Sequence, residues 1–175
     1  MARYLLSSRT LLDIIQRKGQ PGEVWLSAKV KQHGLIARDI CVSAVAPMAV
    51  PREIDRRIAS MKGGTPDPHF TLDDLHRMRR NADAMFREFG AKDRIVAITA
   101  PVAERWGDLL DQAIEYVDPQ GSRYKIGSVQ KLEIATAIVG RDHIPYAYVE
   151  RAQVSHGGID GLTVEDPTVP IATGP

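Results

Sequence analysis

Hydrophobic positions follow two different periods along this chain. In Ser128–Val139 apolar residues recur every three or four positions, which predicts a helix with one apolar face and with Ser128 as its N-cap. Tyr4–Leu6, Ile40–Val45 and Ile144–Val149 are short runs rich in apolar and strand-forming residues, and each predicts a strand. Predicted strands and predicted helices thus alternate along much of the sequence.

The remaining segments extend this pattern. Thr71 and Asp74 have the spacing of a capping box, and the apolar stripe after them predicts a long helix to about Phe89. Lys62–His69 is rich in glycine and proline and predicts a surface loop. Further helices are predicted to start over Leu11–Ile15 and to cover Glu23–Gln32, Pro51–Met61 and Pro101–Ala113, and further strands to cover Arg94–Thr99 and Gly161–Val164.

Length and composition favour one domain with a sizeable core. The chain has 175 residues, of which 43% are apolar, and this is enough to bury a hydrophobic core. We expect residues 1–167 to form a single domain and residues 168–175 to form a short, flexible tail. No internal repeat is evident in the sequence.

Charge and cysteine content narrow the classes of function. A net charge of +1 gives no overall attraction to nucleic acid or to an anionic membrane. Cys41 is the only cysteine, so no intrachain disulfide can form, and its apolar neighbours predict a buried strand residue. No apolar run approaches the ~18–20 residues of a membrane span. The N-terminus shows no secretory signal, so we expect a cytoplasmic protein without membrane contact.

The last third of the chain carries motifs of a known nuclease family. Leu132, Ala135, Thr136 and Ala137 match the run D-x-L-I-A-A-T-A, and in this the segment resembles the VapC-type PIN domains. The family's helix opens with an aspartate, whereas Gln130 stands at that position here. The family's next strand ends in T-R-N-x-x-D-F. Of that motif only Arg151 is kept, and Ser155 stands where the aspartate is expected.

The first half of the chain extends the resemblance, which covers about residues 3–167 in all. PIN domains of this type begin L-L-D-T-N-V-L, and here Ser7 replaces the metal-binding aspartate. Val42–Val45 matches the start of V-S-A-V-T-x-A-E, and Ala49 stands at the position of its metal-binding glutamate. Ala103–Leu109 is similar to the family's A-x-R-W-G-x-L. The framework of the family is therefore present without its acidic residues.

The resemblance implies an α/β fold: a PIN-like three-layer α/β/α domain with a central, mostly parallel sheet. Its members use carboxylates to hold Mg²⁺ or Mn²⁺ for RNA cleavage, typically form homodimers, and bind a small antitoxin helix. Because Ser7, Ala49, Gln130 and Ser155 carry no negative charge, we expect no catalytic residues, no metal and no cofactor. The predicted function is that of a catalytically inactive, toxin–antitoxin-related pseudo-nuclease that acts through protein–protein interaction, as a homodimer with an antitoxin-like or other protein partner.

A nucleic-acid-binding protein that does not cleave its ligand is one alternative. Arg9 places a positive charge at the carboxyl edge of the predicted sheet, where the family has its acidic metal site. Lys131 and Arg151 are further candidates for an anion-binding pocket at this edge. The same arginine could instead close the pocket through an internal ion pair. Strongly salt-dependent affinity for RNA or DNA would distinguish nucleic-acid binding from partner binding.

A metal-dependent ribonuclease with a rebuilt site is the other alternative. Glu53, Glu133 and Glu150 are the candidates for relocated Mg²⁺ or Mn²⁺ ligands, since two of them lie one helical turn from a lost position. A turn moves a ligand by ~5 Å, too far for a shared metal. We therefore expect these glutamates to face solvent or to pair with neighbouring basic residues. The five histidines show no zinc-ligand spacing.

Overall fold

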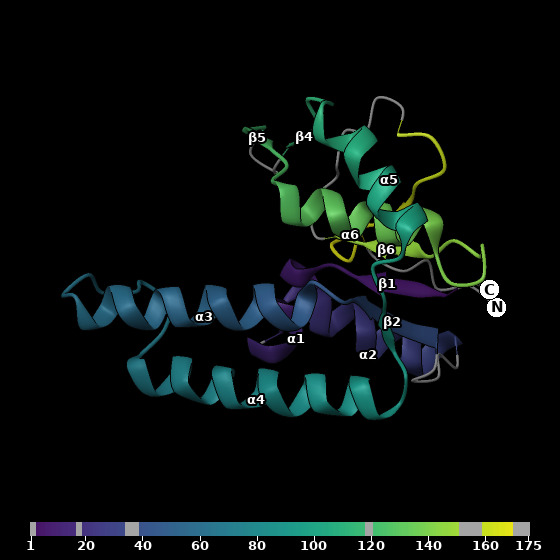
Figure 1. The fold of residues 1–175 in the computed structure, drawn as a ribbon. Coiled ribbons are helices and arrows are strands. Elements are labelled where there is room, and N and C mark those ends of the chain that lie inside the picture. The colour runs from purple at the N-terminus through teal and green to yellow at the C-terminus, as the bar shows by residue number, and fades with distance from the viewer. Residues whose placement is uncertain (1–2, 17–18, 34–38, 118–120, 151–158, 170–175) are drawn as a thin grey trace.

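The computed structural model describes residues 3–16, 19–33, 39–117, 121–150 and 159–169 of the chain. Its centre is a five-stranded sheet in which all neighbouring strands are parallel, in the order β3-β2-β1-β6-β7 (Figure 1). The α/β class predicted from sequence is confirmed. The strands are β1 (Tyr4–Leu6), β2 (Ile40–Ser43), β3 (Ile95–Val96), β6 (Ala147–Val149) and β7 (Thr163–Glu165).

Helices cover both faces of this sheet in the described part of the chain. The first four helices pack on one face and the last two on the other, so the three-layer α/β/α arrangement is confirmed (Figure 1). The first group comprises α1 (Ser8–Gln16), α2 (Pro21–His33), α3 (Ala46–Lys62) and α4 (Leu72–Ala91), and the second comprises α5 (Ala100–Leu110) and α6 (Ser128–Val139).

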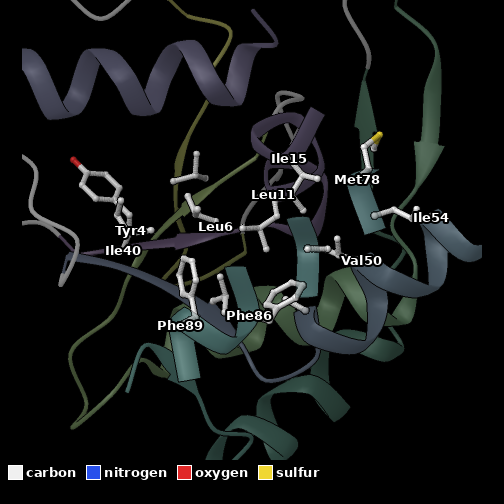
Figure 2. Close-up of a cluster of buried hydrophobic side chains, with 14 of the residues drawn as sticks. Tyr4, Leu6, Leu11, Ile15, Ile40, Val50, Ile54, Met78, Phe86 and Phe89 are labelled. Carbon is white, nitrogen blue, oxygen red and sulfur yellow. The ribbon is translucent and has the colours of Figure 1, made fainter. Parts of the chain in front are cut away.

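The core consists of two hydrophobic clusters, one on each face of the sheet. Because successive strand side chains point to opposite faces, Leu6 joins the cluster under α1–α4 while Leu5 joins the cluster under α5 and α6. Figure 2 shows the first cluster, where Val50 from α3 and Phe86 from α4 pack with Leu6. Each such side chain contributes about 1.5–3 kcal/mol by leaving water. Burial on both faces explains why the two central strands β1 and β2 are almost entirely apolar, whereas β7 at the edge of the sheet is not.

One predicted helix cap is confirmed, while another predicted cap and one predicted helix start are wrong. Thr71 caps α4, and its hydroxyl accepts a hydrogen bond from the Asp74 amide in the predicted capping box. The N-cap of α6 is Gly127, not Ser128, and no side chain caps that helix. α3 begins at Ala46, ahead of the predicted start at Pro51, because Pro47 lies in the first turn, where a proline is tolerated; Pro51 lies inside the helix.

A tight turn shortens the strand that was predicted over Ile144–Val149. β6 begins only at Ala147, because the chain reverses between Gly140 and Ile144. Gly140 has a φ of +69°, and a Cβ atom there would lie 1.8 Å from the Ile144 carbonyl oxygen. Only glycine fits this turn, and the turn occupies the residues that the apolar pattern assigned to the strand.

Other segments differ from the prediction in length or were not predicted. β3 covers only two of the residues predicted over Arg94–Thr99, and α5 ends at Leu110 rather than Ala113. β4 (Glu115–Val117) and β5 (Arg123–Lys125) form a small antiparallel pair that was not predicted, because both strands are short and largely polar. The tail predicted over 168–175 lies mostly outside the described residues. Among the helices that the structure describes, none has the length and apolar character needed to cross a membrane.

Candidate functional site

The carboxyl ends of the parallel strands bring together polar residues that are far apart in the sequence. β1 and β6 are neighbours and end in register, at Leu6 and Val149. Ser8 and Glu150, which follow these strands, therefore lie at one edge of the sheet, where α/β sheets commonly bind ligands. α6 adds polar side chains from the layer above this edge. We call Ser8, Gln130, Glu133, Tyr148 and Glu150 the carboxyl-edge cluster.

Glu133 is the centre of this cluster. Glu133 is only 1% exposed, although its side chain ends in a carboxyl group. The backbone amide of Ser8 donates to Oε1 at 3.0 Å, and the Ser8 hydroxyl donates to the same oxygen. The Tyr148 hydroxyl donates to Oε2 at 3.0 Å. Since Ser8 opens α1, its amide has no partner within that helix, and Glu133 satisfies it. The carboxyl group thereby connects α6 with α1 and β6.

Burial changes the acidity of the cluster. The pKa of Glu133 is raised from 4.5 to about 7, chiefly because burial leaves the charged form poorly solvated. The negative charge of Glu150 also contributes to this rise, while hydrogen bonds from Ser8 and Tyr148 oppose it. Burial, together with the charges of Glu133 and Glu150, raises the pKa of Tyr148 well above 10. Tyr148 therefore remains a neutral donor at physiological pH.

Glu150 is the second buried acid of the cluster, and it is also 1% exposed. The side-chain amide of Gln130 donates to its Oε2 at 3.0 Å. Gln130 occupies one of the positions where the family resemblance predicts a metal-binding aspartate. Here it supplies a hydrogen-bond donor to a carboxylate, which a second aspartate could not do when ionised.

The other positions with replaced acids lie in different surroundings. Ser7 is fully buried, its hydroxyl donates to Thr10 Oγ1 at 3.0 Å, and it accepts from the Thr10 amide at 3.0 Å. It thus ties the chain that leaves β1 to the first turn of α1. Ala49 is half-buried on α3 and has no polar side-chain atom. Ser155 lies outside the described residues.

The three candidates for relocated metal ligands separate into two groups. Glu133 and Glu150 meet in the carboxyl-edge cluster, so the expectation that they face solvent is wrong for both. Glu53 is not in the cluster. It lies on α3, where Oε1 pairs with Arg56 at 2.9 Å and with Arg57 at 3.0 Å. The hydrogen bonds from Arg56 and then Arg57 hold the pKa of Glu53 below 4.5.

The three anion-binding candidates are not brought together by the described part of the chain. Arg9 lies on α1, directly after Ser8. Lys131 is buried, and its ammonium donates to the carbonyls of Leu110 at 2.9 Å and Gln112 at 2.7 Å. It therefore binds the carboxyl end of α5, where a cation complements the helix dipole. Arg151 lies outside the described residues.

The carboxyl-edge cluster does not fit the ligand set of a hard metal ion. Magnesium and manganese need several oxygen ligands with accessible lone pairs. Both oxygens of Glu133 already accept hydrogen bonds from Ser8 and Tyr148. Within the described ranges, no three His, Cys, Asp or Glu side chains are grouped closely enough to hold a metal ion.

Sequence reasoning missed the roles of Tyr148 and Ser8. Tyr148 was assigned only to a strand, and Ser8 was not among the candidate site residues. A signal for the burial of Glu133 existed, however, because α6 carries apolar residues around most of its circumference. A helix of that kind is buried on most sides, so a glutamate in its middle must find partners inside the protein.

No protein-family model matches the chain, and no curated protein sequence matches it either. The structure instead defines a fold class. An open five-stranded parallel sheet with helices on both faces is the architecture of Rossmann-like and PIN-like α/β domains.

Proposed function

We propose that this chain is a PIN-like, VapC-related protein that has lost nuclease chemistry and acts through protein–protein interaction as a homodimer. The observation that carries the proposal is the hydrogen bonding of the Glu133 carboxyl group. In a metal-dependent nuclease the carboxylates at this edge present free oxygens to a cation, which then activates water. Here both carboxylate oxygens of Glu133 are bound by the protein's own donors, Ser8 and Tyr148.

The energetics of the cluster support a structural role for its acids. To bind a metal, Glu133 would have to leave two donors of Ser8 and the hydroxyl of Tyr148 without a partner. Each buried polar group left unsatisfied costs about 1–3 kcal/mol. Burial, and to a lesser extent the charge of Glu150, raises the pKa of Glu133 to about 7, so a proton can neutralise Glu133 near neutral pH and relieve its repulsion with Glu150. A proton thus takes the role that a metal ion has in an acidic active site.

Nucleic-acid binding without cleavage is less well supported. Half of the eight arginines and lysines on α3 and α4 form ion pairs with neighbouring acids. Arg56 pairs with Glu53, Arg77 with Asp74, and Arg79 with Asp55. Paired arginines of this kind offer little free positive charge to a phosphate backbone.

A partner surface is supported by the outward side of α2. Trp25 is buried under this helix, whereas Val24 and Val30 are 55% and 49% exposed. Ser27 lies between them on the same side of the helix and is also exposed. A helix with apolar residues on both its inner and outer sides is expected to be covered on both. We assign this α2 face to the contact between two copies of the chain.

Two measurements test the proposal. In the first, single-stranded RNA is incubated with the protein and Mg²⁺ or Mn²⁺, and the expected result is no cleavage above the protein-free rate. Cleavage that is lost in Glu133→Gln would contradict the loss of nuclease chemistry.

The second measurement addresses the homodimer by sedimentation equilibrium. The wild-type protein is expected to sediment as a dimer, and Val24→Glu combined with Val30→Glu as a monomer. Val129→Glu, which places the same charge on an exposed valine of α6, is the matched control and should stay dimeric. A wild-type monomer, or a dimer that tolerates both α2 substitutions, would refute the assignment.

A further inference from the structure

A pocket of about 600 Å³ lies at the opposite edge of the sheet, where the strands begin. Arg3, Asp39, Arg94 and Tyr146 each directly precede a strand, namely β1, β2, β3 and β6. Parallel strands begin at the same edge, so these four side-chain positions converge although they are far apart in the sequence. All four line the pocket. A volume of this size lies within the ~300–1,000 Å³ that small-molecule sites occupy.

The pocket lining is rich in cations that the fold holds in place. Arg141 joins Arg3 and Arg94 there, so three guanidinium groups line one cavity. Arg94 is 7% exposed, and its guanidinium carbon lies 4.6 Å from the centre of the Phe89 ring. Arg141 donates to Asp93 Oδ2 at 2.9 Å and to the Asp93 carbonyl at 3.0 Å. Arg94 also pairs with Glu88 at 3.5 Å, so acids reduce the net positive charge at both Arg94 and Arg141. A guanidinium group has five N–H donors, more than one acid occupies, and one that is already held in place loses little entropy when it binds an anion.

Cys41 and Tyr146 lie among these cations. The thiol of Cys41 and the hydroxyl of Tyr146 are hydrogen-bonded to each other, and both residues are buried. The positive charges of Arg3 and Arg141 act on both groups, and that of Arg94 acts on Cys41. Positive potential from three separate segments of the chain therefore converges on one part of the pocket. Burial raises the pKa of Tyr146 to about 12, so its hydroxyl is neutral and can donate to a ligand.

Aspartates on the same lining supply the complementary chemistry. Asp39, Asp93 and Asp142 line the pocket beside the arginines. Carboxylates accept hydrogen bonds from hydroxyl groups, and guanidinium groups bind phosphate in a bidentate manner. α4 ends next to the pocket at Ala91, and the negative end of its dipole there opposes an anion. The attraction comes from side chains.

We propose that this pocket binds a small phosphorylated sugar, with its phosphate on the guanidinium groups of Arg3, Arg94 and Arg141 and its hydroxyls on the aspartates. The ligand class follows from the two kinds of polar group on one lining. A simple anion would use only the arginines, and a neutral sugar only the carboxylates. The site is separate from the carboxyl-edge cluster, and the proposal is independent of nuclease activity.

Titration calorimetry of the full chain with ribose 5-phosphate at low ionic strength tests this proposal. The expected result is saturable binding at one site per chain, with no measurable binding of ribose. Inorganic phosphate is expected to bind at least tenfold more weakly than ribose 5-phosphate. Phosphate that binds as tightly as the sugar phosphate would overturn the role of the aspartates, and absence of ribose 5-phosphate binding would overturn the whole site.

Substitutions locate the binding site. Arg3→Gln and Arg141→Lys should each weaken ribose 5-phosphate binding at least tenfold. Arg141→Lys keeps the positive charge but removes the planar guanidinium group that binds phosphate in a bidentate manner. Arg56→Gln is the matched control, because it removes one arginine that lies on α3 outside this pocket, and it should bind as the wild-type protein does. Circular dichroism confirms that each variant is folded. Equal affinity in all three variants would refute the assignment to this pocket.

Discussion

The Glu133→Gln variant should be more stable than the wild-type protein at pH 8 and about equally stable at pH 5. Glutamine has the shape of the protonated glutamic acid and can keep the whole set of contacts. Its amide oxygen can accept from the Ser8 amide and hydroxyl, and its NH₂ group can donate to the Tyr148 oxygen. The substitution therefore removes the charge and leaves the hydrogen bonds in place.

The size of the effect follows from the difference in pKa between the folded and unfolded chains. The Glu133 carboxyl ionises near 4.5 when exposed and near 7 when buried in the fold. Between these values the folded protein keeps a proton that the unfolded chain releases, so the free energy of unfolding falls as the pH rises. Each pKa unit corresponds to about 1.4 kcal/mol, so the loss reaches about 3 kcal/mol by pH 8. The variant does not undergo this loss.

Urea unfolding at pH 5, 6, 7 and 8, followed by the fluorescence of the buried Trp25, measures the effect. The quantity of interest is the difference in unfolding free energy between variant and wild type, because titrating groups that are not coupled to Glu133 cancel in it. That difference should grow from near zero at pH 5 to about 3 kcal/mol at pH 8.

Glu53→Gln is the matched control for this experiment. The pKa of Glu53 is lowered by Arg56, so its contribution to stability is lost only as the pH falls below about 4.5. The difference between this variant and the wild type should therefore stay constant from pH 5 to pH 8. A Glu133→Gln difference that also stays constant over this range would refute the assignment of a raised pKa to Glu133.

Two further substitutions test neighbouring parts of the structure. Tyr148→Phe removes the donor to Glu133 Oε2, so it should raise the pKa of Glu133 further. The protein should be destabilised by about 1–3 kcal/mol, more at pH 8 than at pH 5. An equal loss at both pH values would argue against this hydrogen bond. Gly140→Ala places a Cβ atom 1.8 Å from the Ile144 carbonyl oxygen, at a positive φ. It should cost at least about 2 kcal/mol in thermal unfolding, and a neutral effect would refute the turn geometry.

Apolar segments in the sequence predicted the elements that lie in the core. The helix Ser128–Val139 and the strand Tyr4–Leu6 have the predicted bounds, and both are buried over consecutive residues, all of the strand and Glu133–Ala137 of the helix. The strand β6 was predicted too long because the turn at Gly140 depends on a close backbone contact that no periodicity reveals. The pair β4 and β5 has no apolar pattern to detect.

The two candidate sites could be predicted only in part. The resemblance to PIN domains directed attention to Gln130 and to Glu133, but not to the partners of Glu133. Ser8 lies 125 residues away in the sequence, so this contact depends on the strand order. The same holds for the pocket at the amino edge, where Arg3 and Arg94 meet only because β1 and β3 begin on the same side of one sheet.

The most direct test of the proposed loss of nuclease chemistry is a calorimetric titration of the purified protein with Mn²⁺ at near-neutral pH. The account predicts no heat above that of dilution, because the oxygens of Glu133 are committed to Ser8 and Tyr148. Saturable binding of one Mn²⁺ per chain with micromolar affinity, abolished by Glu133→Gln, would contradict the account and restore a metal-dependent ribonuclease as the function.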